Sequence, residues 1–251
     1  MSAIDQRRHS VPRERKEAFP NLTEQFRRKT QARRQSTGMK HHIAPLTLIL
    51  AAAAAPAAAA AMPPSQAWEI GPWVRGKNYS VGMPNHPRPG ARGSLAMDLP
   101  VVGSGEVDAL TTAVGPLAGA RQITLRYRID APKGTRFIAV EMPSEPATVS
   151  LYFQQAGDNW SGKGRYESHR WYAPRRAVVP LTPGEHSVTV RLNETWTNVR
   201  GHPNHDVPEA FAAALRNTDR IGLAFGSLSR RSHGIYATAA ARFTLLGLDI
   251  N

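Results

Sequence analysis

The sequence predicts an all-β fold, an antiparallel β-sandwich of the jelly-roll type with one short helix in the C-terminal third. Three observations lead to this prediction. Several segments alternate between apolar and polar residues with a period of two, as half-buried strands do. Twenty glycines and twenty prolines divide the chain into short segments, which favours many short strands joined by turns. Only one segment has the apolar spacing of a helix.

The clearest predicted strand is residues 122–129. Its odd-numbered positions are apolar and its even-numbered positions are polar, so one face is expected to be buried. Residues 74–100 are rich in glycine and proline and are expected to form one long loop. Further strands are predicted at 68–73, 149–154, around 171–172 and 178–179, and at 187–192, 221–226 and 241–250.

The single helix is predicted at residues 207–216. Asp206 is the expected N-cap and Pro208 lies in the first turn, a position that proline tolerates. Phe211 and Leu215 are four residues apart and would share one face.

The first 61 residues do not have the pattern of a packed core. Residues 39–61 have a basic start, an apolar stretch and a run of small residues, which are the three parts of a secretory signal peptide. Residues 1–38 are basic and lack apolar periodicity. They are either a basic disordered extension or the result of a start codon assigned too early. Residues 62–251 are expected to form one jelly-roll domain.

Two alternatives exist for the N-terminal region. Residues 43–61 are long enough for a transmembrane anchor, but the prolines and the alanine-rich composition favour a cleaved signal peptide. A twin-arginine signal using Arg7 and Arg8 is disfavoured by the long polar stretch that follows. The expected product is a periplasmic or secreted protein without a stable membrane span after signal cleavage.

The net charge of +13 does not by itself indicate nucleic-acid binding. Residues 1–38 contain ten Lys and Arg against four acidic residues, so roughly half of the excess charge would be lost on export. No nucleic-acid partner is therefore predicted. The chain contains no cysteine, which excludes disulfides, thiolate metal sites, a cysteine nucleophile and a lipid-modified cysteine.

The densest group of polar and aromatic residues lies between residues 152 and 172. Tyr152 and Gln154 have the same strand parity, so both would leave the sheet on one face, whereas Leu151 and Phe153 would point into the core. Flat rings and amide or guanidinium groups on one face suit sugar binding. The predicted ligand-binding residues are Tyr152, Gln154, Asp158, Trp160, Arg165, Trp171 and Trp196. For any one of them, a structural role in the sandwich is the competing interpretation.

Other candidate chemistry is weak. His202, His205 and Asp206 could ligate a metal, but their spacing matches no zinc motif, so no metal and no cofactor is predicted. Asp158, Glu167 and Glu194 could converge as acid and base for glycoside hydrolysis, although acidic residues are scarce on the predicted sheet faces. No Gly-x-Ser-x-Gly, His-Glu-x-x-His, P-loop or dinucleotide fingerprint is present. No catalytic residue is assigned, and a non-catalytic domain is favoured.

Several segments resemble the galactose-binding-like jelly rolls, a superfamily that contains many carbohydrate-binding modules and the complex I intermediate-associated type domains. The resembling segments are residues 151–154 with 158–160, then 170–172, 196–199 and 220–226. The resemblance implies sugar binding through one sheet face or through the loops at one end, often without enzymatic activity. The paired strand signatures of jelly-roll polysaccharide lyases are absent.

Three functions follow as hypotheses. The first is an exported, non-catalytic domain that binds a glycan or cell-envelope polysaccharide. The second is a polysaccharide-active enzyme, a glycoside hydrolase or lyase. The third is an envelope structural or assembly protein with a protein partner. A polar and aromatic groove would favour the first two, carboxylates converging in that groove would favour the enzyme, and a flat apolar patch would favour the third.

Overall fold

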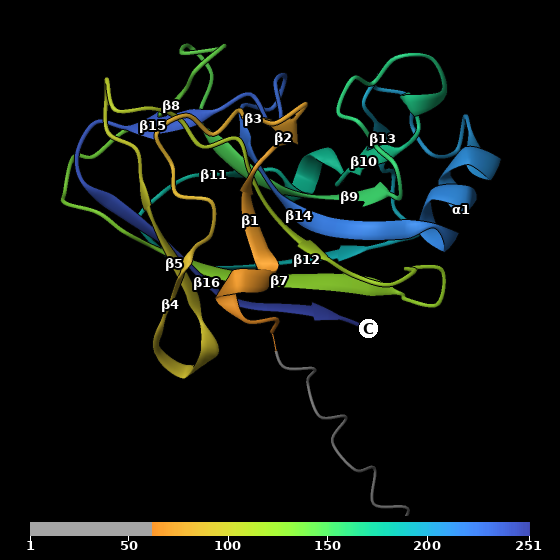
Figure 1. Cartoon of the computed structure of the whole chain (residues 1–251), viewed down its shortest axis with the longest axis horizontal. Coiled ribbons are helices and arrows are strands. Elements are labelled where there is room, and N and C mark those ends of the chain that lie inside the picture. Colours follow the sequence, from red (N-terminus) through yellow and green to blue (C-terminus); the bar gives the residue numbers. More distant parts are fainter. Residues whose placement is uncertain (1–61) are drawn as a thin grey trace, which may run out of the picture. The chain divides into compact units, whose positions relative to one another are not determined.

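The computed structural model describes residues 62–251 (Figure 1). Two antiparallel sheets pack face to face, so the predicted all-β sandwich is confirmed. The predicted extension, 1–38, and signal peptide, 39–61, lie outside the described residues. Within 62–251 no helix is long and apolar enough to cross a membrane.

The larger sheet has seven strands. Its strand order is β1-β6-β14-β9-β10-β13, and β11 pairs with the N-terminal end of β9. The strands are β1 (Trp68–Gly71), β6 (Ala109–Ala113), β9 (Thr148–Gln155), β10 (Arg170–Tyr172), β11 (Val179–Pro180), β13 (Thr197–Asn198) and β14 (Thr218–Gly226).

The smaller sheet has five strands in the order β12-β7-β16-β5-β4. They are β4 (Arg88–Pro89), β5 (Leu95–Leu99), β7 (Gln122–Asp130), β12 (Gly184–Arg191) and β16 (Ala241–Ile250). Two short ribbons complete the β structure: β2 (Trp73–Val74) with β3 (Lys77–Asn78), and β8 (Phe137–Ala139) with β15 (Ile235–Ala237).

The connectivity is that of a jelly roll. The strand orders β5-β16-β7-β12 and β6-β14-β9-β10 make up the two facing sheets, with β1 added beside β6. Apart from the hairpin that joins β9 to β10, each successive strand of this set crosses to the opposite sheet. This double Greek-key arrangement defines the jelly roll.

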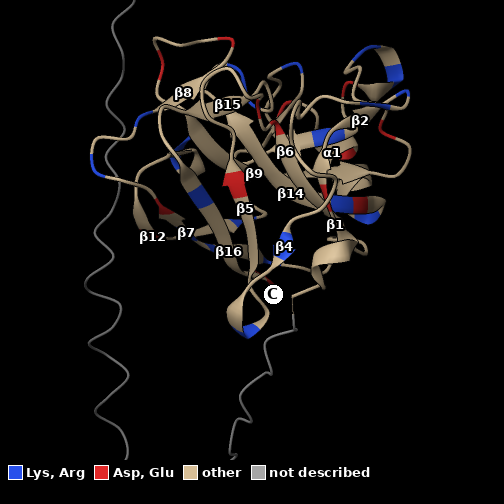
Figure 2. Cartoon of the chain, turned by 60° about the vertical axis from the view of Figure 1, so that its left-hand side comes forward, with Lys and Arg blue, Asp and Glu red and all other residues tan. Residues whose placement is uncertain are grey.

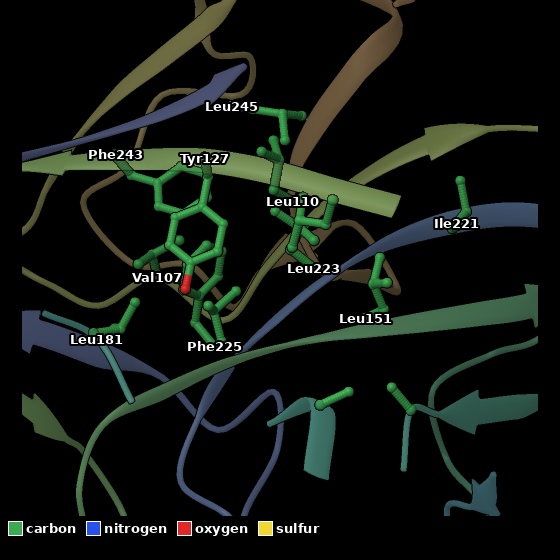
Figure 3. Packing of buried hydrophobic residues seen from close by; sticks show 14 of the residues in the cluster. Val107, Leu110, Tyr127, Leu151, Leu181, Ile221, Leu223, Phe225, Phe243 and Leu245 are labelled. Atoms are coloured by element: carbon green, nitrogen blue, oxygen red, sulfur yellow. The ribbon is translucent and has the colours of Figure 1, made fainter. Parts of the chain in front are cut away.

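The core fills the space between the sheets (Figure 3). Tyr127 of β7 stacks on Phe243 of β16 with ring centres 5.1 Å apart, and Phe225 of β14 meets Phe243 edge-on at 5.4 Å. Aromatic pairs in these geometries add to the stability gained from apolar burial. The alternation predicted for residues 122–129 is confirmed, because the odd-numbered positions of β7 are buried.

The helix α1 (Pro208–Arg216) forms as predicted, and Phe211 is buried against Phe153 of β9. The predicted capping is wrong. The N-cap residue is Val207, without a side-chain cap bond, and Asp206 is exposed beside His205. Four 3₁₀ turns complete the described part of the chain: Ser65–Ala67, Ala91–Gly93, Gly164–Tyr166 and Arg175–Ala177.

The prediction of one long loop over 74–100 is also wrong. This segment contains β3, β4 and β5. In β5 the side chains of Leu95, Met97 and Leu99 are buried in the core, a period of two that the flanking prolines and glycines obscure.

Candidate functional site

The outer face of the seven-stranded sheet combines aromatic residues with very small ones. Tyr152 of β9 and Tyr172 of β10 lie here with Ala109 of β6 and Ala224 of β14. Gly222 of β14 makes room for Tyr152, since a Cβ at this position would lie 2.9 Å from Tyr152 Cε1. Small neighbours therefore let a large ring lie close against the sheet.

The predicted parity of β9 is confirmed. Leu151 and Phe153 belong to the core between the sheets, and Tyr152 belongs to a separate cluster on the outer face. Tyr152 is nonetheless fully buried, because Trp160 from the following loop covers it edge-on with ring centres 5.6 Å apart. Its hydroxyl bonds to Thr111 of β6, and burial raises the pKa of this phenol.

A buried ion pair holds that loop on the sheet. Nη1 of Arg170 donates to Oδ2 of Asp158 at 3.0 Å, and the same oxygen accepts a hydrogen bond from Gln154 Nε2 at 2.7 Å. Nε of Arg170 donates to the hydroxyl of Tyr172 at 3.1 Å. Both ionic side chains are almost fully buried, with 5% and 2% of their surface exposed. Buried partners of this kind depend strongly on one another.

The structure brings four of the seven predicted ligand-binding residues together. These are Tyr152, Gln154, Asp158 and Trp160, which Arg170 joins into one cluster. Arg165 lies apart on the exposed 3₁₀ turn Gly164–Tyr166, where it bonds to Tyr166.

The two remaining predicted residues, Trp171 and Trp196, lie in the core. Both indoles are fully buried. Trp171 meets Phe211 edge-on at 4.8 Å, and Trp196 packs on Phe153 at 5.2 Å. Their ring nitrogens donate to backbone carbonyls. A ligand on the surface cannot reach either ring. Both tryptophans therefore have the structural role that was the competing interpretation of these residues.

A cleft of about 860 Å³ opens beside this cluster. It lies between the β2–β3 hairpin, the segment before β6, the end of β8, the loop after β9, strand β10 and the loop before β15. Trp160, Arg170 and Tyr172 line it. Trp73 and Tyr79, with 39% and 43% of their surface exposed, line it as well.

The hairpin that carries Trp73 and Tyr79 is fixed to the sheet. Asn78 Nδ2 donates to the carbonyl of Ile70 at 2.9 Å, and Ser80 Oγ donates to the carbonyl of Gly71 at 2.5 Å. The backbone N–H of Tyr79 donates to the carbonyl of Pro72. The backbone that carries the two exposed rings is therefore held in place beside the cleft.

Three carboxylates line the same cleft: Glu106, Asp108 and Glu141. Glu106 Oε2 and Asp108 Oδ1 flank Gly234, since a Cβ there would lie 2.4 and 3.0 Å from them. Burial, followed by the nearby charges of Glu106 and Glu141, raises the pKa of Asp108 to about 8. Burial, and then Glu141, also raises the pKa of Glu106. Among residues 62–251, Asp108 Oδ1 has no hydrogen-bond partner.

These are not the carboxylates expected from the sequence. Asp158 is paired with Arg170, and Glu194 is paired with the exposed Arg176, which lowers the pKa of Glu194. His205 contacts only the exposed Asp206 among the ion pairs of the described chain. Within 62–251 no group of three or more His, Cys, Asp or Glu side chains is arranged to hold a metal.

Sequence reasoning missed the β2–β3 hairpin and its two aromatic residues. One signal was present, since Arg75 and Gly76 form a two-residue turn between the strands, both with positive φ. Such turns favour Asn-Gly or Asp-Gly, so Arg-Gly gave only a weak indication. Asp108 had another signal, because it is an acidic residue between the apolar Val107 and Ala109.

Charge around the cleft is mixed. Figure 2 shows basic and acidic segments together in the loops at the end of the sandwich where β2, β8 and β15 lie. The lining itself contains Arg75, Lys77 and Arg231 as well as the three carboxylates.

Comparison with solved structures finds distant similarities. One is a carbohydrate-binding module, CBM28, specific for non-crystalline cellulose, with 12% identity, a TM-score of 0.39, and coverage of 74% of this chain and 87% of that chain. Another comes from a study of endo-acting O-glycanases that members of the human gut microbiota express to initiate mucin breakdown. It has 11% identity, a TM-score of 0.37, and coverage of 76% of this chain and 93% of that chain.

At such identities and TM-scores, neither match carries information on ligand or activity. No protein-family model matches the sequence, and no curated protein matches it.

Proposed function

We propose that this domain binds a polysaccharide in the cleft between the β2–β3 hairpin and strand β10. The observation that carries the proposal is the pair of exposed aromatic rings, Trp73 and Tyr79, on an anchored hairpin beside a cleft of about 860 Å³. Apolar C–H faces of sugar rings pack on flat aromatic faces, and the remaining hydroxyls need polar partners.

Polar groups for those hydroxyls are present on the cleft walls. Lys77, Asn159 and Ser161 line the cleft with His233. Concave sites that combine aromatic residues with a few polar groups, at volumes of about 300–1,000 Å³, are typical binding sites. Because the hairpin and the Arg170 cluster are already held by hydrogen bonds, little ordering would be required when a ligand binds.

The test is affinity gel electrophoresis of the purified protein in gels that contain neutral or acidic polysaccharides. We expect retardation by at least one polysaccharide, and its loss in Trp73→Ala and Tyr79→Ala. The matched control is Tyr166→Ala, which removes a partly exposed ring of the 3₁₀ turn Gly164–Tyr166. Retardation that survives both cleft variants would exclude this cleft. No retardation by any polysaccharide would refute the proposal.

The proposal includes export. Residues 39–61 have the composition of a signal peptide, and a periplasmic or secreted location would place the cleft next to envelope polysaccharide. Expression of the full chain in a bacterial host, followed by N-terminal sequencing of the exported product, tests this. We expect a mature chain that begins near residue 62. An uncleaved chain in the cytoplasmic fraction would contradict it.

A second candidate is a polysaccharide-cleaving enzyme, and the three cleft carboxylates favour it. A carboxyl group with a pKa of about 8 is protonated at neutral pH, as a general acid must be. Release of reducing ends from a bound polysaccharide that Asp108→Asn abolishes would support the enzyme. Binding without release of reducing ends would support the binding function and contradict the enzyme.

A further inference from the structure

A second pocket, of about 440 Å³, lies against the cleft. The two hollows share the wall formed by Trp160, Arg170, Tyr172 and Arg231. The second pocket is also lined by the loop after β13 and by the loop before β15. We call it the arginine pocket.

The charges of this pocket have one sign. Its lining contains Arg170, Arg200, Arg230 and Arg231, with His233, and no aspartate or glutamate. Arg170 is neutralised by Asp158 at 3.0 Å, and Arg230 lies 3.5 Å from Glu141. Within residues 62–251, Arg200 and Arg231 form no ion pair. Two positive charges of the pocket are therefore left without a counter-ion from the described chain.

Arg231 is the more constrained of the two. It is half-buried, its Nη1 donates to the carbonyl of Ala173 at 2.6 Å, and its guanidinium lies 5.6 Å from the ring centre of Tyr172. Burial, with the nearby charge of Arg175, lowers the pKa of Arg231. A partly desolvated cation without a counter-ion is unfavourable, and a bound anion would offset this cost.

The loop that carries Arg200 is also held in place. Oδ1 of the buried Asn198 accepts hydrogen bonds from the backbone N–H groups of Arg200 at 2.9 Å and His202 at 3.0 Å. Val199 packs against Gly162 so closely that a Cβ on this glycine would lie 2.5 Å from Val199 Cγ2. The arginine pocket is thus bounded by packed loops, which fix the backbone position of Arg200.

We propose that the arginine pocket binds the negatively charged substituent, a carboxylate or sulfate, of an acidic polysaccharide whose backbone lies in the adjoining cleft. The inference rests on the proposed function and names its ligand class. Planar guanidinium groups bind carboxylate and sulfate oxygens through paired N–H donors. Because the cleft and the arginine pocket share a wall, one polysaccharide chain can occupy the cleft while its charged group reaches Arg231.

The test is isothermal titration calorimetry of the purified protein with three classes of oligosaccharide: polyuronates for the carboxylate, sulfated glycosaminoglycans for the sulfate, and uncharged glucans and xylans. We expect tighter binding of one acidic class, with affinity that falls as salt increases. The loss of a charge-assisted hydrogen bond in Arg231→Gln or Arg200→Gln should weaken acidic ligands about 10-fold to 100-fold. Neutral ligands should be unaffected.

Controls separate charge from folding. Arg136→Gln removes an exposed arginine that lines neither the arginine pocket nor the cleft, and it should leave all affinities unchanged. Thermal unfolding of each variant shows whether the fold is retained. If Arg231→Gln unfolds, the exposed loop variant Arg200→Gln carries the test.

The outcomes are distinct. Equal binding of neutral and acidic oligosaccharides by the wild type and both pocket variants would overturn the inference while the proposed function stands. No oligosaccharide binding at all would overturn both. Binding of single-stranded or duplex DNA, lost in Arg231→Gln and without binding of acidic oligosaccharides, would assign the pocket to nucleic acid and overturn the inference.

Discussion

The guanidinium carbon of Arg170 lies 3.9 Å from the ring centre of Trp160. Arg170 belongs to strand β10, and Trp160 belongs to the loop that covers Tyr152 on the outer face of the sheet. Trp160 has a positive φ of 65°, which a bulky residue adopts only when its surroundings hold it there. The cation-π contact and the ion pair with Asp158 supply that constraint, and the wall of the cleft depends on them.

Removal of Asp158 should therefore destabilise the fold strongly. Asp158→Ala leaves the buried charge of Arg170 without its partner, and we expect a loss of about 3–5 kcal/mol in the free energy of unfolding, measured by urea denaturation. The control is Asp130→Ala, which breaks the exposed pair with Arg128 and should cost less than about 1 kcal/mol. Equal effects of the two substitutions would show that the buried pair does not hold the loop.

The tryptophans should divide into two classes. Trp196→Ala removes a fully buried indole and should reduce the free energy of unfolding by about 3–5 kcal/mol. Trp73→Ala removes a partly exposed ring and should change it by less than about 1 kcal/mol, while it lowers polysaccharide affinity. Chemical denaturation and affinity gels on both variants provide the measurement. A stable Trp196→Ala variant that has lost binding would instead place Trp196 at the ligand.

Gly222 should not tolerate a methyl group. A Cβ there would lie 2.5 Å from the carbonyl oxygen of Leu110 as well as close to Tyr152, so Gly222→Ala should cost about 1–3 kcal/mol through overpacking. The control is Gly115→Ala, since a Cβ at Gly115 meets nothing within 4 Å. Melting temperatures of the two variants test this, and a Gly222→Ala variant as stable as wild type would contradict the close packing of Tyr152.

Asp108 should make stability depend on pH. Its pKa is about 8 in the folded protein and near 3.8 when unperturbed, so between these values the native state holds a proton that the unfolded state has released. The free energy of unfolding should therefore fall as pH rises from about 4 to about 8, by at most about 1.4 kcal/mol per pH unit from this group. The Asp108→Asn variant should lack this contribution to the pH dependence of the free energy of unfolding.

Urea denaturation of the wild type and Asp108→Asn at about pH 5.5, 7 and 8.5 measures this dependence. The wild type should lose stability relative to the variant as pH rises. Parallel pH profiles for the two proteins would mean that Asp108 ionises normally in the native state.

Alternation alone did not decide which strands could be predicted from the sequence, because β5 also alternates and was missed among its flanking prolines and glycines. The strand β7 shows the alternation because its outer face is exposed. The strand β6 was missed because four of its five residues are buried, on both faces, so no alternation exists. The position of β6 between β1 and β14, with its outer face against Tyr152, is a tertiary property that local sequence does not carry.

The candidate site was predictable only in part for a similar reason. Strand parity placed Tyr152 and Gln154 together, since both lie on β9. The side of the sheet that Trp171 faces depends on its pairing with Phe153, a core residue, and pairing between strands cannot be derived from one strand. Glu106, Asp108 and Glu141 meet only because β15 pairs with β8 and a bridge joins Ile235 to Val107.

The two ends of the described chain lie at the side of the sandwich away from the cleft. Strand β1 begins, and β16 ends, on the lower side in Figure 1, whereas β2, β3, β8 and β15 lie on the upper side. The backbone of Arg121 bonds to the last residue, Asn251, on that lower side. A tether at Asn251 would thus leave the cleft facing outward. Several copies fixed to one surface in this way would present their clefts in parallel, so a single long polymer chain could engage many copies with an avidity far above that of one.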